Sequence, residues 1–379
     1  MRWGDAWRRT RVRTAMAVMR MLLGRVVAEA PERYVTDLTE ILHLPEVKKH
    51  ITEWTPWTSA FVEEYGFTSD FPLQFRRSHA FEQRFIYRMS DVIAVPGSGV
   101  VLVPDRGFLM AESYGSPLRA LRWGDVRPDM LARPFDPGWP GPVVLSPPTG
   151  YYHWLLEILP RVLTAHDSQP TVKALVTTDG PSYIGDALSL LGIDRVETDR
   201  PAVRLRDVLV PGALQASGFV PSGDVELLRD SVLPRVSGLH PEQSAPGLVY
   251  ISRARDARRR LGNECAVEAL VTGLGFDVVY LQDLTWTEQV HRMSRAHVVV
   301  SPHGAGLANM IWSSSLSAVI EIFPVGVRND CYARLALQRG ADYSFLAAEP
   351  EPGSSGTVNL ERLKQLIAPG LHTSSTGRV

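Results

Sequence analysis

Short apolar runs alternate with helix-forming segments in two successive series, and this alternation constrains the fold more than any other feature of the sequence. In the first series, strands are predicted at 142–146, 174–177 and 208–210. Helices are predicted after each of them, at 152–165, 181–191 and 225–236. Strands separated by helices favour a parallel sheet of the Rossmann type.

A second and cleaner series begins after a linker rich in Ser, Gly and Pro at 237–247. It predicts strands at 248–251, 276–281, 297–300 and 318–322, and helices at 264–274, 285–296 and from 305. Thr285 and Glu288 form a capping box that opens the helix at 285. The predicted fold class is therefore α/β, with two Rossmann-like domains that face each other across a cleft.

The same patterns set the expected domain boundaries. We expect a helical or irregular N-terminal extension at 1–90 and a first Rossmann-like domain at 91–240. A second Rossmann-like domain, which would bind a nucleotide, is expected at 248–345, and a loop, a helix and a tail at 346–379.

Charge and cysteine content narrow the functional class. The 379 residues carry a formal net charge of -1, so no global basic field favours nucleic acid. Two cysteines, Cys265 and Cys331, are too few for a disulfide framework and are typical of a cytoplasmic protein. Residues 1–27 predict either a basic amphipathic helix in peripheral contact with the inner face of the membrane or a solvated terminal helix. No window approaches about 18 uncharged apolar residues, so no transmembrane helix is predicted.

The segment 297–310 carries the strongest functional signal. A buried strand ends at Ser301 and Pro302, the glycine-bearing turn 303–306 follows, and a helix begins at once. The glycines would permit strained torsions and close approach of a ligand, while the helix N-terminus presents free N–H groups to an anion. We expect a diphosphate here, with a donor from His303. The alternative is a plain turn with small residues for close packing.

Two residues at neighbouring strand ends belong with this turn. Arg253 follows the strand 248–251, and because parallel strands align their carboxyl ends, its guanidinium should face the turn and bind phosphate. The other arginines of its loop, at 255 and 258–260, fit a solvated face. Glu321 stands inside the apolar strand 318–322, where a carboxylate needs a partner. It would accept hydrogen bonds from a ribose or form a structural ion pair.

The first domain offers a candidate base. His153 and Glu157 stand at i and i+4 near the start of the helix 152–165, on one helix face. His153 would deprotonate an acceptor hydroxyl while Glu157 orients its ring; the alternative is a structural histidine. The chain contains no Asp-x-Asp pair and no zinc-type cluster of His and Cys. We therefore expect no metal and no cofactor, and a phosphate site built from a helix dipole and arginine.

These motifs together resemble glycosyltransferase family 61, over about 90–345. The shared segments are Tyr152-His153-Trp154 to Arg161, Tyr250-Ile251-Ser252-Arg253, Ser301-Pro302-His303-Gly304-Ala305-Gly306-Leu307-Ala308-Asn309-Met310 and Glu321-Ile322-Phe323-Pro324. The resemblance implies a GT-B fold and an inverting, metal-independent transfer from a nucleotide sugar, with UDP as the expected nucleotide. It also implies a bacterial member whose acceptor is a glycan or a lipid-linked sugar in cell-surface polysaccharide synthesis.

Within that frame, the residues take distinct roles. His153 and Glu157 would be catalytic. Donor contacts would come from one larger set: Arg253, Ser301, His303, Gly304, Ala305, Gly306, Asn309 and Glu321. Two other classes stay open: a non-catalytic protein that senses a nucleotide sugar or scaffolds a complex, and a dehydrogenase, against which the missing G-x-G-x-x-G fingerprint weighs.

Overall fold

The computed structural model describes residues 49–66, 75–103, 108–109, 134–214, 216–237, 247–256 and 258–373. Contacts between residues divide the chain into two compact units. Unit 1 comprises 1–62 and 80–219, and unit 2 comprises 63–79 and 220–379. The candidate membrane helix at 1–27 lies outside the described residues. Among those that are described, no helix has the length and apolarity needed to cross a bilayer.

Unit 1 is built on a six-stranded mixed sheet with the order β1-β4-β12-β8-β9-β10. Its strands are β1 (Ile51–Thr58), β4 (Arg84–Met89), β12 (Val208–Pro211), β8 (Val143–Leu145), β9 (Lys173–Thr177) and β10 (Arg195–Thr198). The four strands from β12 to β10 are parallel, whereas β1 and β4 pair antiparallel. The strands predicted at 142–146, 174–177 and 208–210 are thus confirmed, but the sheet is only partly parallel.

Two strands of this sheet contradict the expected helical or irregular character of 1–90. β1 reads Ile-Thr-Glu-Trp-Thr-Pro-Trp-Thr and exposes five consecutive residues after Ile51. An edge strand buries little, so it lacks the alternation of apolar and polar residues that identifies most strands. β2 (Phe61–Glu64) and β3 (Ser78–Phe81) form a separate two-stranded sheet.

A second sheet of unit 1 is antiparallel and has the order β11-β5-β6-β7. It contains β11 (Val203–Leu205), β5 (Val92–Val95), β6 (Val100–Val103) and β7 (Phe108–Leu109). The helix expected at 152–165 consists of α6 (Tyr151–His153), a π-helical turn η3 (Trp154–Ile158) and α7 (Leu159–Ser168). Pro160 lacks the amide that would bond to residue 156, and the π turn ends two residues before it. α8 (Ser182–Leu191) ends at Gly192, which has φ 71° as a left-handed cap.

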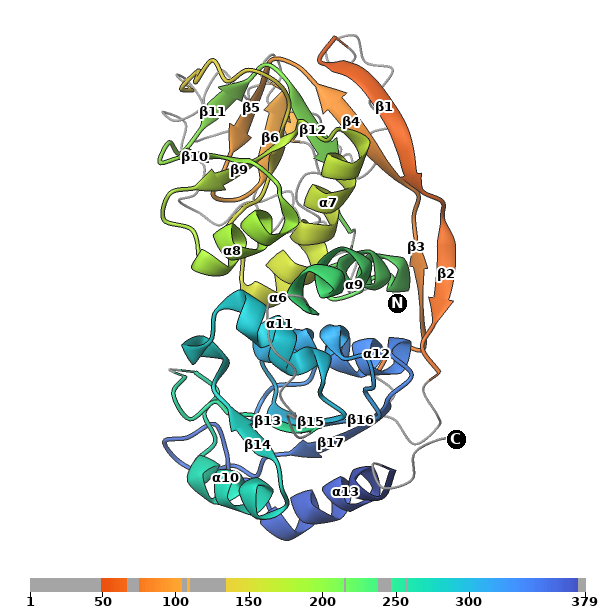
Figure 1. Cartoon of the computed structure of the whole chain (residues 1–379), viewed down its shortest axis with the longest axis vertical. Coiled ribbons are helices and arrows are strands. Elements are labelled where there is room, and N and C mark those ends of the chain that lie inside the picture. The colour runs from red at the N-terminus through yellow and green to blue at the C-terminus, as the bar shows by residue number, and fades with distance from the viewer. Residues whose placement is uncertain are drawn as a thin grey trace, which may run out of the picture. The chain divides into compact units, whose positions relative to one another are not determined.

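Unit 2 contains a wholly parallel sheet of five strands with the order β14-β13-β15-β16-β17. The strands are β13 (Leu248–Ile251), β14 (Asp277–Val279), β15 (Val298–Pro302), β16 (Ala318–Phe323) and β17 (Asp342–Ala347). α10 (Glu264–Gly273) and α13 (Leu360–Thr373) cover one face of the sheet (Figure 1). The other face carries α11 (Trp286–Ser294), the segment η5 (Ala305–Trp312) and α12 (Cys331–Gln338) (Figure 1).

Three details of unit 2 bear on the predictions. The capping box at Thr285 and Glu288 is confirmed. The helix expected from 305 is a 3₁₀ helix, η5, and not an α-helix. α9 (Ser222–Ser237), expected in the first domain, groups with unit 2, because it packs on α11 and η5 and Arg229 Nη1 donates to the Ser313 carbonyl at 2.8 Å.

Candidate functional site

The sheet of unit 2 has one point at which the chain reverses its direction across the sheet. β14 lies on one side of β13 and β15 lies on the other. If the five strands are numbered along the chain, their order across the sheet is 2-1-3-4-5. Loops that leave β13 and β15 therefore diverge to opposite faces. Open α/β sheets with this order bind ligands at the carboxyl ends of those two strands. The residues at this switch point are those that follow Ile251 and Pro302.

Arg253 lies against the backbone of Gly304 at the switch point. A Cβ atom at position 304 would overlap Arg253 Nη1, and its three nearest atoms would all belong to Arg253. Position 304 therefore needs glycine to admit the guanidinium. The expectation of strained torsions was wrong, because Gly304 has an extended backbone with φ -179° and Gly306 is not among the glycines with positive φ. Gly306 instead admits the side chains of Leu281 and Ile251.

The Arg253 side chain is held on one side only. Its Nη2 atom lies 3.0 Å from Asp256 Oδ2 and donates to the Arg258 carbonyl at 3.0 Å. Its Nε atom is buried and has no hydrogen-bond partner among the described residues. The side chain is 17% exposed. An arginine anchored at one nitrogen, with further donors uncommitted, is suited to a ligand oxygen.

A buried carboxylate that the sequence did not single out organises the Arg253 loop. Glu264 Oε1 accepts hydrogen bonds from the Tyr250 hydroxyl at 2.7 Å and from the Arg253 amide at 3.1 Å. Its Oε2 accepts from the Leu261 amide at 3.3 Å, so one side chain binds both ends of the loop. Glu264 is 3% exposed. Its only sequence signal is a carboxylate in the first turn of a helix, which helix capping explains equally well.

His303 and Glu321 form a buried pair next to Gly304. His303 Nδ1 contacts Glu321 Oε1, and the Tyr343 hydroxyl donates to Glu321 Oε2 at 2.6 Å. Burial raises the pKa of Glu321, although the bonds from His303 and Tyr343 oppose this. Burial also raises the Tyr343 pKa well above its ordinary value. Both carboxylate oxygens of Glu321 already have a protein partner, and the residue is 0% exposed. Of the two roles predicted for Glu321, the structure therefore favours a structural pair over a contact with ribose.

The other residues predicted around the turn differ in accessibility. Ser301 is buried and its hydroxyl donates to the Ile251 carbonyl at 3.1 Å. Asn309 is also buried; its Oδ1 accepts from Trp312 Nε1 at 3.0 Å, and its Nδ2 donates to Gln289 at 3.3 Å. These two side chains therefore support the turn from within. Ala305 and Gly306 are partly exposed.

In unit 1, the second group of predicted residues also comes together. His153 Nδ1 lies 3.1 Å from Glu157 Oε2. Glu157 Oε1 accepts from the Ser217 hydroxyl at 2.8 Å and from the Gly218 amide at 2.9 Å. Burial alone would raise the Glu157 pKa, but these donors and His153 outweigh it and hold the pKa below its ordinary value. Glu157 is thus a carboxylate at neutral pH and lies against His153 Nδ1, which is also 3.2 Å from the Ser217 hydroxyl.

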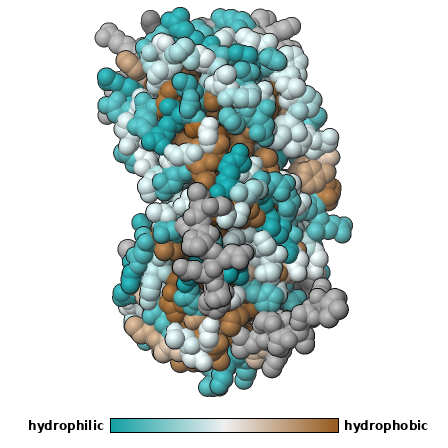
Figure 2. Space-filling view, in the orientation of Figure 1, coloured by the Kyte–Doolittle hydropathy of each residue, from teal (hydrophilic) through white to brown (hydrophobic). Residues whose placement is uncertain are grey.

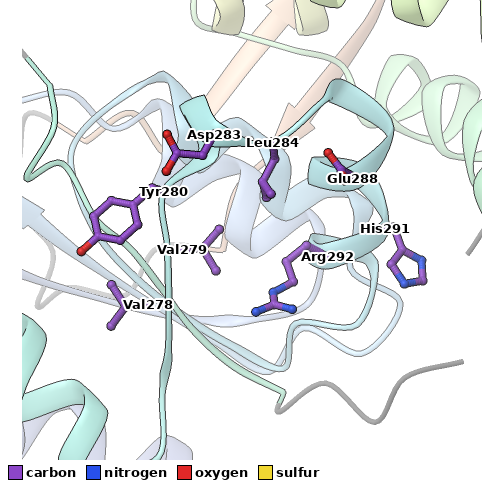
Figure 3. Close-up of a pocket in the computed structure, with 8 residues that line it drawn as sticks. All are labelled: Val278, Val279, Tyr280, Asp283, Leu284, Glu288, His291 and Arg292. Atoms are coloured by element: carbon purple, nitrogen blue, oxygen red, sulfur yellow. The ribbon is translucent and has the colours of Figure 1, made fainter. Parts of the chain in front are cut away.

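A cavity of about 380 Å³ lies beside β14, the edge strand of the parallel sheet. Val278, Val279 and Leu284 supply apolar walls, Tyr280 and Asp283 stand at one end, and Glu288, His291 and Arg292 line it from α11 (Figure 3). Arg255 connects this cavity to the Arg253 loop. Its guanidinium lies 4.0 Å above the Tyr280 ring and forms an ion pair with Asp283.

Metal ligands do not cluster in the described parts of either unit: no group of three or more His, Cys, Asp or Glu side chains there could hold an ion.

Comparison with known proteins agrees with the motifs. Residues 151–320 match the model of the family Glycosyltransferase 61. The matched segment includes His153 and Glu157, the Arg253 loop and the turn at 303–306, and it stops one residue before Glu321. This confirms the resemblance to that family over 151–320; the expected extension of the resemblance to about 90 and to 345 lies outside the match. No curated protein matches the chain.

Proposed function

We propose that this chain, which belongs to glycosyltransferase family 61 through residues 151–320, is an inverting, metal-independent transferase that uses a nucleotide-sugar donor, with UDP as the nucleotide. Family membership supports glycosyltransferase activity and implies a sugar donor and an acceptor. The inverting course, the independence of metal, the nucleotide and the GT-B arrangement of the two units are our proposal.

One observation carries the donor site: the Arg253 guanidinium lies against Gly304 at the switch point of the parallel sheet. Two loops from the two strands that flank this point thus bring together a cation and a stretch of backbone that is partly exposed at Ala305 and Gly306. A diphosphate bound there would meet Arg253 and the amides of Ala305 and Gly306. These donors would stabilise the charge that develops on the leaving diphosphate, which is the main electrostatic requirement of the transfer.

His153 and Glu157 of unit 1 supply the proposed reactive groups. In an inverting transfer, a base removes the proton of the acceptor hydroxyl while its oxygen attacks the anomeric carbon, and the bond to the diphosphate breaks on the opposite face. We propose His153 as this base. Its Nε2 lone pair would take the proton, and the resulting imidazolium would be stabilised by the Glu157 carboxylate at Nδ1.

The cavity beside β14 is the proposed place for the nucleoside. It adjoins the loop that carries Arg253, because Arg255 of that loop covers Tyr280 and pairs with Asp283 at the cavity's end. An ion pair this exposed contributes little to stability. Asp283 can therefore exchange its partner for ribose hydroxyls, and the Tyr280 and Leu284 walls suit an apolar base face.

The acceptor and the cellular place are proposed more broadly. We propose a glycan or a lipid-linked sugar of the cell surface as the acceptor, and a cytoplasmic protein that contacts the inner face of the membrane peripherally through 1–27. The surface viewed in Figure 2 is mainly hydrophilic or neutral in colour, with smaller hydrophobic patches. The large apolar side chains exposed among the described residues are Trp54, Phe61, Val62, Phe135 and Val325.

Nucleotide binding and donor hydrolysis test this function directly. We expect UDP and UDP-sugars to raise the melting temperature and NAD to leave it unchanged. Slow hydrolysis of the donor should persist in EDTA and should be lost in His153→Ala while UDP still binds. Stabilisation by NAD alone would refute the transferase. Donor hydrolysis that needs a divalent ion would refute metal independence. An unchanged rate of hydrolysis in His153→Ala would show that His153 is not the base.

A further inference from the structure

Arg259 holds a backbone conformation that an arginine rarely adopts. Among the described residues, only Asp91 and Arg259 are non-glycine residues with positive φ, at 56° and 60°. Aspartate enters this region with relative ease, and Asp91 is held there by a bidentate pair with Arg204, including a bond of 2.7 Å. Arginine has no such local hydrogen-bonding advantage, so the loop must impose its conformation.

No contact within the described residues accounts for this conformation. The Arg259 side chain is exposed and forms no hydrogen bond or ion pair with another described residue. The neighbouring main chain is fixed, since the Arg258 carbonyl accepts from Arg253 Nη2 at 3.0 Å and the Arg260 carbonyl accepts from the Ser355 amide at 3.3 Å. A strained residue between two anchored carbonyls, with an uncommitted guanidinium, points to a ligand outside the chain.

The charges of Arg259 and Arg253 both act on Tyr332, a residue that packs against His303. Tyr332 is buried with its ring edge-to-face against His303 at 5.1 Å between centroids. Burial raises the Tyr332 pKa well above its ordinary value, and the charges of both Arg259 and Arg253 oppose that rise. In the backbone, Arg259 directly follows Arg258, whose carbonyl accepts from Arg253 Nη2 at 3.0 Å, so the two arginines belong to one contacting segment.

The backbone of the loop is also held at both of its ends. Glu264 binds the amides at both ends, Arg253 at 3.1 Å and Leu261 at 3.3 Å. The Arg253 side chain spans the loop to the residue directly before Arg259. A loop whose backbone is already ordered loses less conformational entropy when it binds an anion.

We propose that Arg259 is a second guanidinium for the diphosphate of the donor, acting beside Arg253. This rests on the proposed donor site. A diphosphate carries charge on both phosphates, which one arginine at Gly304 neutralises only in part. Arg259 would bind the phosphate that Arg253 does not reach.

Arg259→Gly provides the test, because glycine removes the guanidinium and at the same time relieves the backbone. By calorimetry, we expect UDP to bind about tenfold more weakly, as for one lost charge-assisted hydrogen bond, with uridine affinity unchanged. The melting temperature should equal or exceed that of the wild type. Arg259→Asn, which also tolerates positive φ, should bind UDP like the glycine variant. Arg260→Ala, the adjacent exposed arginine, is the matched control and should bind UDP normally.

The outcomes separate this inference from the proposed function. If UDP binds the wild type and Arg253→Ala weakens it, but Arg259→Gly and Arg259→Asn bind UDP normally, Arg259 has no part and the donor site stands. If Arg260→Ala and Arg259→Gly lose the same amount of UDP affinity, the effect comes from the general positive charge of the loop, and the specific role of Arg259 is wrong. If the wild type binds no nucleoside diphosphate, both the donor site and the role of Arg259 are wrong.

Discussion

Gly304→Ala should separate binding from folding at the proposed donor site. The added methyl group would occupy the place of Arg253 Nη1, with all three nearest atoms in that side chain. Alanine adopts the extended backbone of position 304 without strain, because φ is -179°. The substitution should therefore displace the guanidinium and leave the turn itself unchanged.

The magnitudes follow from what Arg253 loses. Displacement weakens its pair with Asp256, worth about 0–1 kcal/mol, and its hydrogen bond to the Arg258 carbonyl, worth about 1 kcal/mol, so the melting temperature should fall by only a few degrees. Loss of a charge-assisted contact to phosphate costs about 1.5–3 kcal/mol. That range corresponds to roughly 10- to 150-fold weaker binding of UDP.

Calorimetry with UDP, paired with thermal unfolding, measures both quantities. Gly273→Ala is the matched control, since a Cβ there meets no atom within 4 Å and the residue lies at the end of α10. It should bind UDP normally. In the Arg253→Ala background, Gly304→Ala should have almost no further effect on binding. Wild-type affinity in Gly304→Ala, or additive losses in the double variant, would refute the idea that Arg253 acts on phosphate next to Gly304.

Three further predictions concern the other groups. Glu157→Gln should lower the rate of transfer about 10²- to 10⁴-fold while UDP affinity persists, since His153 loses its charged partner; a rate within a few-fold of wild type would argue against this role. Because the pKa of Glu157 lies below its ordinary value of 4.5, its contribution to stability is present above that pH and is lost as pH falls through the lower value. Chemical denaturation at several acidic pH values should accordingly show a shallower loss of stability in Glu157→Gln than in the wild type, and parallel curves would contradict the shift. Leu284→Trp should fill the cavity beside β14 and weaken UDP binding while pyrophosphate binds normally; equal losses for both ligands, or none, would place the nucleoside elsewhere.

The three central strands of the unit 2 sheet were predictable because they are short, apolar and buried on both faces, whereas the partly exposed edge strand β17 was not predicted. The runs at 248–251, 297–300 and 318–322 recur as β13, β15 and β16. The capping box at Thr285 was equally predictable, because capping is a local interaction between residues three apart. β1, by contrast, is an exposed edge strand, and its pairing with β4 depends on a partner about 30 residues away.

Some features of the candidate site could likewise be predicted from the sequence, and others could not. Residue order alone determined that Arg253 and the turn at 303–306 follow parallel strands, so their proximity could be expected before any coordinates were known. Only the tertiary structure decided how each polar group is used: that Gly304 admits a guanidinium, that Glu321 is enclosed by His303 and Tyr343, and that Glu264 braces the loop. Sequence periodicity reports which face of an element is buried. The partner of a buried charge depends on side chains brought together from distant parts of the chain, and no local pattern encodes that choice.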